Sequence, residues 1–504
     1  MLFSSIFSAA ASALLFSTSL VQAAPAPAPS DPALAAGGTL AVIAGDLVTL
    51  SYSTNDPADN NWIGIWHANG GPVGEVKVDP SLTWSYVKAA KGTLHLDVSG
   101  FEGGQYRAFF LSRDGYRSLA NPVTFNVPGQ APQGFSFVTG AITLQNARQR
   151  DAYTARLAGL VSGAKGGVQF SKSSGPQWVQ VSADGVLSGR PDASGTANVV
   201  VRATSGGATT NLQINIPVRR AGTPLVSEIR VLTFNLWIGG THVSNYHNKQ
   251  IKFILEQNID ILGVQESTGA HATRIAKALG WWVYEAGDLG IISRYPIVEE
   301  YGHISASIGV RIALDGAAKQ INFWDAHFSA YPYGPYDLCF DKQSVDFAMK
   351  REASSGRAQQ VADTLKAMAP QIAAANNIPV ILMGDTNAPS HLDWTDRNKH
   401  CGYGNVPWPT SVKPLQAGLI DSFRAVHPDP AAVPGTTWSP IYPFNEGTTG
   451  KVEPQDRIDI IYHAGSMTPI DSRVVMAGNP RPYGQHGNNE WTSDHAAVLT
   501  TYRL

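Results

Sequence analysis

Cysteine is scarce in this chain, whose 504 residues include only two, Cys339 and Cys401. Two cysteines allow at most one intramolecular disulfide. Both stand in loop-like stretches of the C-terminal half, and an oxidising compartment would favour their pairing. A disulfide also needs Cα atoms about 6 Å apart. The sequence does not fix that distance, so the bridge is expected from the compartment alone.

Positive charge is not in excess either. The formal net charge is −2, and no basic run is longer than a pair such as Lys350-Arg351. Proteins that bind nucleic acid usually rely on a basic field for affinity. Long-range attraction for DNA is therefore expected to be weak. A metal ion and a few well-placed arginines can replace such a field, which leaves a nuclease as an alternative.

Long apolar runs are missing beyond the first residues of the chain. Residues 1–23 have an apolar core too short for a membrane span and end in Val21-Gln22-Ala23, a pattern typical of a secretory signal peptide. The Ala- and Pro-rich residues 24–35 then predict an extended linker. No Asn-x-Ser/Thr site occurs, and the C-terminal VLTTYRL lacks the apolar tail of a lipid-anchor signal. We expect a secreted, extracellular protein with no transmembrane segment.

The chain is long enough for three folded units, because 504 residues exceed one ordinary domain and 43% of them are hydrophobic. The first unit, residues 36–128, has short alternating strands separated by turn residues, which is typical of a β-sandwich. Through the segments NWIGIWHA and GGQYRAFFLSRDGY it resembles small immunoglobulin-like modules. Its aromatic residues are expected in the core rather than on a ligand platform. They are Trp62, Trp66, Trp84 and Tyr106.

Residues 132–220 form a second β-rich unit. The segment GPQWVQVSADGVLSGRPDASGTANVVVRAT within it is similar to the immunoglobulin-like, cadherin-like repeats of secreted proteins. The likeness does not imply a calcium site, because such sites need clustered acidic residues and only the scattered Asp184 and Asp192 are present. The predicted fold begins with two N-terminal all-β, immunoglobulin-like sandwiches.

The third unit, residues 226–504, alternates strands and helices. Strand-like 231–235 is followed by helix-like 246–258, strand-like 260–265 and helix-like 271–280. Interleaving of this kind predicts an α/β domain.

Five motifs in this unit place polar side chains beside apolar, strand-like runs. In chain order they are TFNLW with Asn235, GVQES with Glu266, GDTNAPS with Asp385 and Asn387, DRIDIIY with Asp459, and SDHAAV with Asp494 and His495. Polar groups at strand ends gather at one place. Phosphoester cleavage needs a hard cation on oxygen ligands, a base for water and donors for the phosphoryl oxygens. The motifs supply all three and predict a metal-assisted phosphoester hydrolase.

In order and spacing, these motifs resemble the endonuclease/exonuclease/phosphatase superfamily, which includes deoxyribonucleases, abasic-site endonucleases, neutral sphingomyelinases and inositol polyphosphate 5-phosphatases. The resemblance spans about residues 226–504, and the pairing of GDTN with SDH is its most specific part. It implies a two-sheet α/β sandwich with helices outside and an active site at one edge of the packed sheets.

The resemblance implies a metal site. Glu266 and Asn235 would hold a divalent cation, with Asp494 at or beside the same ion. Mg²⁺ is the expected cation, and Mn²⁺ and Ca²⁺ are alternatives.

The resemblance also implies the catalytic groups. Asp385 and Asn387 match the pair that orients the attacking water, and Asn387 would also contact the phosphate. His495 matches the imidazole that faces the reacting phosphate, with Asp459 as its hydrogen-bond partner. A carboxylate behind a histidine fixes its tautomer and raises its basicity, which suits proton transfer near neutral pH.

Two further residues lie between these motifs. His327, in the run INFWDAHFSA, matches a second family histidine that can serve the leaving oxygen. Arg357 opens the predicted helix 356–368 with an R-x-x-Q pattern that deoxyribonuclease-like and sphingomyelinase-like members resemble. The planar guanidinium of Arg357 could bind the substrate phosphate or brace the site, because it pairs with a phosphate or a carboxylate in the same geometry.

At two positions this sequence differs from the patterns of particular subfamilies, which reduces the number of activities to consider. Trp237 stands where abasic-site endonucleases carry another acidic group, which puts that activity in doubt. The segment PQDRIDI lacks the Trp-Cys of the inositol 5-phosphatase signature, so an inositol-phosphate-type phosphatase is a minor alternative.

Aromatic loops beside the motifs bear on the substrate. Residues 329–355 and 393–412 are rich in Tyr, Pro or Trp, and such loops can stack on bases or sugars or dip into lipid head groups. The segment between His327 and Arg357, with its Tyr, Asp and Cys, also resembles bacterial sphingomyelinases, and together with secretion this resemblance implies a phosphodiester of a phospholipid head group or a phosphoglycan. A secreted nuclease is the main alternative. A surface or glycan-binding protein with a silent hydrolase domain is less favoured, because no matched catalytic position is replaced by an inert residue.

Overall fold

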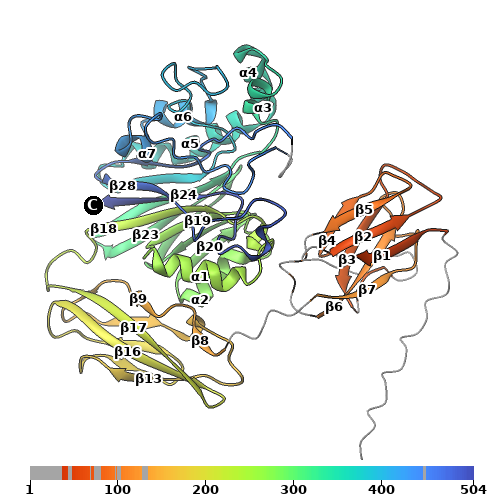
Figure 1. Ribbon diagram of the computed structural model, residues 1–504. Helices are drawn as coiled ribbons and strands as arrows, with labels where there is room; N and C mark the ends of the chain where they lie inside the picture. The colour runs from red at the N-terminus through yellow and green to blue at the C-terminus, as the bar shows by residue number, and fades with distance from the viewer. Residues whose placement is uncertain are drawn as a thin grey trace, which may run out of the picture.

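The computed structural model describes residues 37–43, 48–68, 70–72, 81–96, 98, 101, 104–127, 134–445 and 450–504. The predicted signal peptide (1–23) and linker (24–35) lie outside the described residues. Two β-rich units precede a larger α/β unit (Figure 1). Within the described residues no helix combines the length and the apolar character that a membrane crossing requires.

The first β unit consists of two antiparallel sheets. One has the order β1 (Thr39–Ile43), β2 (Val48–Ser53), β5 (Lys91–Leu96), and the other β4 (Thr83–Tyr86), β3 (Trp62–His67), β6 (Gly104–Leu111), β7 (Val123–Val127). Alternation along β3 turns Ile63 and Ile65 into the core with Leu50 and Phe110, whereas Trp62 and Trp66 join a second cluster. The β-rich prediction is confirmed, and the immunoglobulin-like identity stays a prediction.

The aromatic residues of this unit do not all lie in its interior. Trp62, Trp66 and Tyr106 are buried, as expected. Trp84 is 51% exposed, because it lies on the edge strand β4.

The second β unit is dominated by one long hairpin. Strands β16 (Gly195–Ser205) and β17 (Ala208–Arg219) are joined by Gly206 and Gly207, both with positive φ, as a tight two-residue hairpin turn requires. Buried side chains alternate along β17 with exposed ones. The remaining elements are β8 (Ser136–Phe137), β9 (Ala141–Thr143), β10 (Ala147–Arg148), β11 (Tyr153–Arg156), η1 (Ala158–Leu160), β12 (Val161–Ser162), β13 (Gln169–Ser174), β14 (Gln180–Val181) and β15 (Val186–Gly189).

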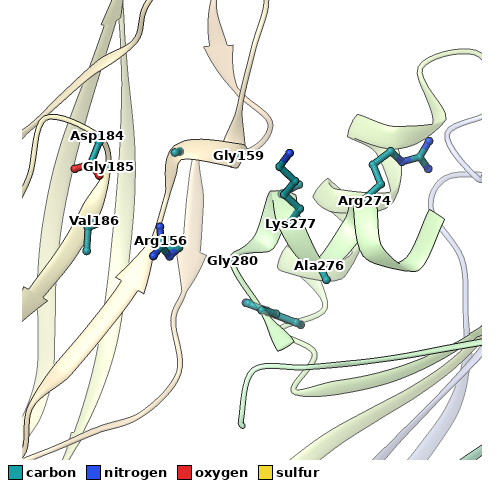
Figure 2. A pocket seen from close by; sticks show the side chains of 12 residues that line it. Arg156, Gly159, Asp184, Gly185, Val186, Arg274, Ala276, Lys277 and Gly280 are labelled. Atoms are coloured by element: carbon teal, nitrogen blue, oxygen red, sulfur yellow. The ribbon is translucent and has the colours of Figure 1, made fainter. Parts of the chain in front are cut away.

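The second β unit and the α/β unit share one hydrophobic core. A continuous cluster includes Leu212 and Ile214 of β17 together with Ile254 and Ile275 of the α/β unit. The backbones also approach closely, because a Cβ added at Gly159 would lie 2.4 Å from the Ala278 carbonyl oxygen. Figure 2 shows this junction, where Arg156 and Gly159 face the helix that carries Arg274 and Lys277. The two units are therefore packed against each other as one body.

The α/β unit contains two six-stranded sheets. The first has the order β20 (Trp282–Ala286), β21 (Leu289–Ser293), β19 (Ile261–Gln265), β18 (Glu228–Asn235), β29 (Ala497–Arg503), β28 (Thr468–Val475). The second has the order β22 (Ile297–Ile304), β23 (Ser307–Ala317), β24 (Lys319–His327), β25 (Val380–Asp385), β27 (Asp459–Ala464), β26 (Ile420–Asp421). A central core with Val231, Ile291, Phe323 and Ile381 contains residues of both sheets. The predicted two-sheet α/β sandwich is confirmed.

Helices cover the outer faces of this sandwich. α1 (Tyr246–Glu256) and α2 (His271–Leu279) pack on the first sheet, and α5 (Arg357–Ala373) packs on the second. The shorter elements are η2 (Ile238–Gly240), α3 (Gly334–Cys339), α4 (Val345–Ser354), α6 (Pro409–Gln416), α7 (Ser422–Val426) and η3 (His486–Asn488).

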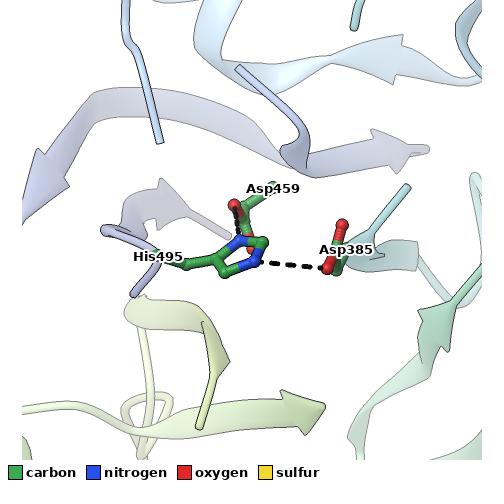
Figure 3. Close-up of side chains that lie close together, drawn as sticks. All are labelled: Asp385, Asp459 and His495. Carbon is green, nitrogen blue, oxygen red and sulfur yellow. Dashed lines mark hydrogen bonds and ion pairs between the residues drawn. The ribbon is translucent and has the colours of Figure 1, made fainter. Parts of the chain in front are cut away.

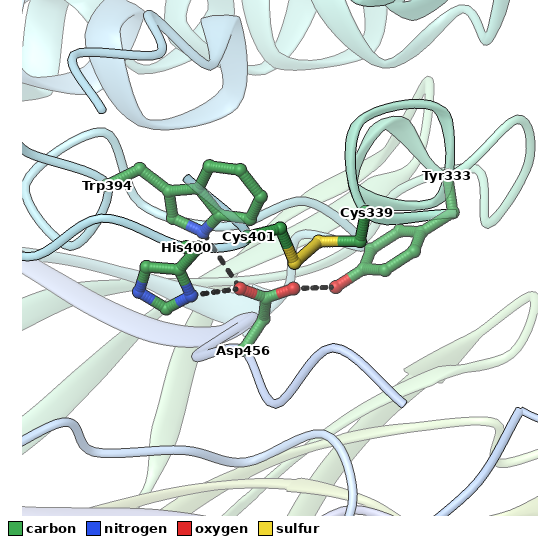
Figure 4. The surroundings of a disulfide bond; sticks show 6 residues. All are labelled: Tyr333, Cys339, Trp394, His400, Cys401 and Asp456. Carbon is green, nitrogen blue, oxygen red and sulfur yellow. Dashed lines mark hydrogen bonds and ion pairs between the residues drawn. A yellow bond between two sulfur atoms is a disulfide. The ribbon is translucent and has the colours of Figure 1, made fainter. Parts of the chain in front are cut away.

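The two aromatic loops predicted beside the site pack together. Cys339 and Cys401 form a disulfide with a Cα–Cα distance of 5.2 Å, so their expected pairing is confirmed. Beside the disulfide, buried Asp456 accepts hydrogen bonds from the Tyr333 hydroxyl (2.8 Å) and Trp394 Nε1 (2.8 Å) (Figure 4). The two loops are thus joined to each other by the disulfide and by hydrogen bonds to the same carboxylate.

Candidate active site

Strand ends bring the predicted residues to one edge of the sandwich. His327 ends β24 and is paired with Asp385 at the end of β25, and Asp385 is paired with Asp459 at the start of the antiparallel β27. In the other sheet Asn235 ends β18 and is paired with Gln265, so Glu266 is the next residue at the same edge. Motifs that are far apart in the sequence therefore form a single cluster in the structure.

Two imidazoles in this cluster have the same arrangement. His495 Nδ1 donates to Asp459 Oδ2 (2.9 Å), and His327 Nδ1 donates to Asp288 Oδ2 (2.6 Å). The opposite ring nitrogens both face Asp385, with Nε2 to Oδ2 distances of 3.7 Å for His495 and 3.6 Å for His327. Figure 3 shows His495 between its two carboxylates. One carboxylate oxygen is therefore flanked by two imidazoles.

These carboxylates control the charge of both histidines. Burial opposes the charged form of His327, but the hydrogen bond to Asp288 and the charge of Asp385 outweigh burial and raise the pKa to about 9. Burial likewise opposes the charged form of His495, while Asp459 and Asp385 hold its pKa well above the usual range. The neighbouring carboxylates therefore favour the charged form of both rings.

Asp385 is held by amide groups. It is 1% exposed, and its Oδ1 accepts the Asn387 backbone N–H (2.8 Å). Its Oδ2 accepts Nδ2 of Asn235 (3.0 Å) and of Asn387 (3.3 Å). Asn387 has a φ of 47°, a left-handed conformation that Asn adopts more readily than most residues. This bend turns the Asn387 amide back onto the preceding carboxylate.

Glu266 and Asp494 fit a divalent cation. Asp494 is 7% exposed, and its Oδ1 has no hydrogen-bond partner. Burial raises the pKa of Asp494 to about 7, and the nearby charge of Glu266 adds to this while His495 opposes it. Glu266 Oε2 accepts the backbone N–H of Ile238 (2.8 Å). Two close carboxylates with spare oxygens are what a hard cation requires.

Asn235 links the predicted metal residue Glu266 to Asp385. Its Oδ1 accepts the Trp237 backbone N–H (2.9 Å), which fixes the orientation of the amide. Its Nδ2 then donates to Glu266 Oε1 (3.2 Å) and to Asp385. The Asn235 amide thus joins Glu266 and Asp385, and its role as a metal ligand stays a prediction.

A second group of side chains offers ligand atoms for an ion. Asp385, Asp459 and His495 each present one such atom, and these atoms lie within 4.8 Å of one another. The hydrogen bond from His495 Nδ1 to Asp459 already uses part of this set.

Arg357 braces the loop that follows His327. The side chain is 0% exposed and pairs with buried Glu352 through Nε (2.8 Å) and a second, shorter contact. Its remaining N–H groups donate to the carbonyl oxygens of residues 329, 330 and 332. All five donors are occupied, so the predicted substrate-binding role is corrected to the bracing role.

Asp288 is a site residue that the sequence did not reveal. It lies in the turn between β20 and β21, directly after Gly287. An Asp beside a Gly between two strands is usually a turn residue. Its contact with His327 arises only because β24 of the other sheet ends nearby, and no local signal could have indicated that.

The arginine of the RID motif is structural. Arg457 is 2% exposed and forms ion pairs with Asp393 (3.0 Å) and Asp421 (2.8 Å). The same Asp393 also pairs with Arg424 (2.5 Å). This buried network fixes the chain immediately before Asp459.

Known proteins resemble the α/β unit. Residues 232–495 match the family described as Endonuclease/Exonuclease/phosphatase family. An uncharacterised protein of Caenorhabditis elegans, F14F9.5, is 32% identical over 290 residues, which cover 54% of this chain and 91% of that protein.

Several solved structures overlap with this chain. The crystal structure of D. rerio TDP2 complexed with single strand DNA product is 15% identical, covers 55% of this chain and 100% of its own, and has a TM-score of 0.37. An endonuclease/exonuclease/phosphatase family protein from Bacteroides thetaiotaomicron is 15% identical and covers 55% of this chain and 97% of its own, with a TM-score of 0.36. The human Nocturnin catalytic domain with bound sulfate anion is 14% identical and covers 56% and 96%, with a TM-score of 0.36.

Proposed function

The chain belongs to the endonuclease/exonuclease/phosphatase family, and we propose that it is a divalent-metal-dependent phosphodiesterase that acts outside the cell. The proposed substrate is a phosphodiester of a phospholipid head group or a phosphoglycan. The observation that carries the proposal is the convergence of two carboxylate-backed imidazoles on Asp385, beside the Glu266 and Asp494 pair.

The residues divide the chemistry between them. Glu266 and Asp494 would hold the cation, with Mg²⁺ as the proposed ion, and such a cation polarises the phosphoryl group when bound. Asp385 and Asn387 orient the attacking water, and Asp385 Oδ2 is the atom placed to accept its proton.

The two histidines act as acids in this proposal. Because the neighbouring carboxylates favour the charged form of both rings, each can donate Nε2–H to an oxygen of the phosphate. His495 then stabilises charge on the phosphoryl oxygens, and His327 supplies the proton to the leaving oxygen. This charge-stabilising role differs from the proton transfer that the sequence predicted for His495 and Asp459.

Two features support the proposed location and substrate. The disulfide between Cys339 and Cys401 is of a kind found mainly in oxidising compartments. The net charge of −2 provides little long-range attraction for nucleic acid. Both favour an extracellular, non-nucleic substrate.

The test is release of nitrophenol from bis-p-nitrophenyl phosphate and, in parallel, from the monoester. We expect Mg²⁺-dependent cleavage with preference for the diester. Loss of the His495 imidazole in His495→Ala should lower turnover at least about 100-fold, the usual scale for losing a donor that stabilises charge in the transition state.

The matched control is His67→Ala, because His67 is exposed on the first β unit. Preference for the monoester would instead indicate a phosphatase. Full turnover in His495→Ala would rule out the assigned chemistry.

A further inference from the structure

The candidate active site is divided between the two sheets of the α/β unit. Glu266 follows β19 and Asp494 lies shortly before β29, and both strands belong to the first sheet. His327 and Asp385 end β24 and β25 of the second sheet. Catalytic groups act only in a defined geometry, so the spacing between the two sheets is part of this site.

A layer of buried polar side chains lies between the sheets, beneath these groups. It consists of Thr233 on β18, Gln265 on β19 and Asp325 on β24, and all three are 0% exposed. Thr233 and Asp325 each stand two residues before the site residue that ends their strand, and Gln265 directly precedes Glu266. The layer is therefore one step along the strands from the catalytic residues.

Gln265 connects the two sheets within this layer. Its Nε2 donates to Asp325 Oδ1 (2.6 Å) and to Thr233 Oγ1 (3.2 Å). Gly263 leaves the room for this contact, because a Cβ added there would lie 2.7 Å from Asp325 Cγ. Gly263 and Gln265 are two residues apart on one strand and therefore face the same way. The first sheet thus offers Asp325 a gap to enter and an amide to bind.

This contact is costly for the fold. Gln265 Oε1 and Asp325 Oδ2 are buried and have no hydrogen-bond partner within the described residues. Buried acceptors without partners destabilise a protein, whereas two apolar side chains of similar shape would pack here without that cost. A costly polar pair directly beneath the catalytic groups indicates a role beyond stability.

The Asp325 carboxyl is suited to an uncharged contact. Burial raises its pKa well above the usual range, the hydrogen bond from Gln265 opposes this, and the charge of Asp288 adds to it. These effects together favour the uncharged acid. An uncharged carboxyl can hold Gln265 without adding a second negative charge beside Asp288, the partner of His327.

We propose that the contact between Gln265 and Asp325 positions the two halves of the active site, so that Asp325 is a positioning residue for catalysis. It sets the distance from His327, two residues further along β24, to Glu266, the residue after Gln265. The inference rests on the proposed function and adds a residue that touches neither substrate nor cation.

The test replaces both partners by apolar side chains in the double variant Gln265→Met/Asp325→Leu. Because both unpaired acceptors are removed together, this variant should keep or gain stability against denaturant. Its kcat for bis-p-nitrophenyl phosphate should fall at least about tenfold with little change in KM, since misplacing a catalytic group by about 1 Å can cost about 100-fold. A merely structural pair would not lower turnover while stability is kept.

Two further readouts do not depend on turnover. The Mg²⁺-dependent rise in melting temperature should persist in the double variant, because the proposed ligands Glu266 and Asp494 both belong to the first sheet. The pKa of His327, followed by NMR of its imidazole, should fall. The reason is that the ring would lie less closely against Asp288, which comes from the turn between β20 and β21 of the first sheet.

A conservative variant and a matched control complete the test. Asp325→Asn is uncharged and keeps an acceptor for Gln265 Nε2, so it should retain most of the turnover and the His327 pKa. The control Ser472→Ala/Thr500→Val removes another buried side-chain pair of the first sheet, which is joined at 2.8 Å with both residues 0% exposed. It should leave kcat and the His327 pKa unchanged.

Unchanged kcat together with an unchanged His327 pKa in the double variant would overturn the inference. A loss in Asp325→Asn as large as in the double variant would overturn it as well. If the double variant does not fold, Gln265→Asn shortens the amide by one carbon, and the same fall in kcat and in the His327 pKa is expected there. If the wild-type protein cleaves no diester, the proposed function fails, and the His327 pKa alone then decides whether the contact positions the ring.

Discussion

His327 and His495 point their Nε2 atoms at the same oxygen of Asp385, from 3.6 Å and 3.7 Å. His327 ends β24 whereas His495 lies just before β29, and each ring is held from behind by a carboxylate. The reacting phosphate would thus meet two acidic N–H groups and one basic oxygen in a confined space. The following predictions depend on this arrangement and on the packing that supports it.

Asp288 is predicted to position and charge His327. Asp288→Asn removes the carboxylate that helps to hold the His327 pKa at about 9, so the pKa should fall. The protonated form needed at the leaving oxygen then disappears at lower pH, and the basic limb of the kcat profile should move to lower pH. Turnover at neutral pH should drop roughly tenfold or more. A pH series with a diester substrate measures both effects.

The control for this prediction is Asp59→Asn, an exposed acidic residue of the first β unit. An unchanged pH profile in Asp288→Asn would show that the contact is merely structural.

Metal binding is predicted to depend on Glu266 and Asp494. Addition of Mg²⁺ should raise the melting temperature, because an ion that binds only the folded state stabilises it by about 2.7 kcal/mol at 100 times its Kd. In Glu266→Gln and Asp494→Asn this Mg²⁺-dependent rise should be much smaller. Differential scanning fluorimetry with EDTA and stepwise Mg²⁺ tests this independently of turnover. A full rise in both variants would place the ion elsewhere, for example at Asp385, Asp459 and His495.

Arg357 is predicted to matter for stability rather than for substrate affinity. Arg357→Ala leaves Glu352 buried without its partner, and breaking a buried ion pair in this way costs about 3–5 kcal/mol. Arg357→Lys should also destabilise the fold, because an ammonium group cannot replace the five directed N–H donors. Chemical denaturation measures the loss. A raised KM with normal stability would instead support direct contact with the substrate.

Acid is predicted to weaken the fold through buried histidines. His463 is 3% exposed, and burial lowers its pKa to about 4. Its stabilising contribution is complete above the unfolded pKa near 6.5 and is lost as the pH falls towards 4. Between pH 7 and pH 5 one such group should reduce the free energy of unfolding by on the order of 2 kcal/mol.

Denaturation curves at the two pH values should show this loss, and His463→Asn should show less of it than His67→Asn. If both variants lose the same free energy of unfolding between pH 7 and pH 5, the acid sensitivity belongs to other groups. His247 and His271 are candidates, because their pKa values are also lowered to about 4.

The sequence predicted the site well where function depends on strand ends. Asp385, Asp459 and His495 meet because their motifs flank strands that pair in one sheet or in its partner. It predicted less where a contact depends on how two elements pack. The Asp288 carboxylate reaches His327 across the two sheets, and the Asn235 amide is turned by a backbone N–H two residues later. Neither of these two contacts can be predicted from the local sequence.

The role of Arg357 also depends on packing and therefore could not be decided from the sequence. An R-x-x-Q pattern at the start of a helix was compatible with a phosphate ligand or with a structural brace. Glu352 decides between them, because it is buried on the preceding helix α4 and takes two of the five N–H groups.

The hydrophobic core shared by the second β unit and the α/β unit has a consequence for how this chain could be shortened or rearranged. Ile254 and Ile275 are buried in a cluster that also contains Leu212 and Ile214. A chain that begins after the second β unit would expose this apolar face to water and favour aggregation. The hydrolase of this protein is therefore a two-part body, and within the described residues only the first β unit has a core of its own.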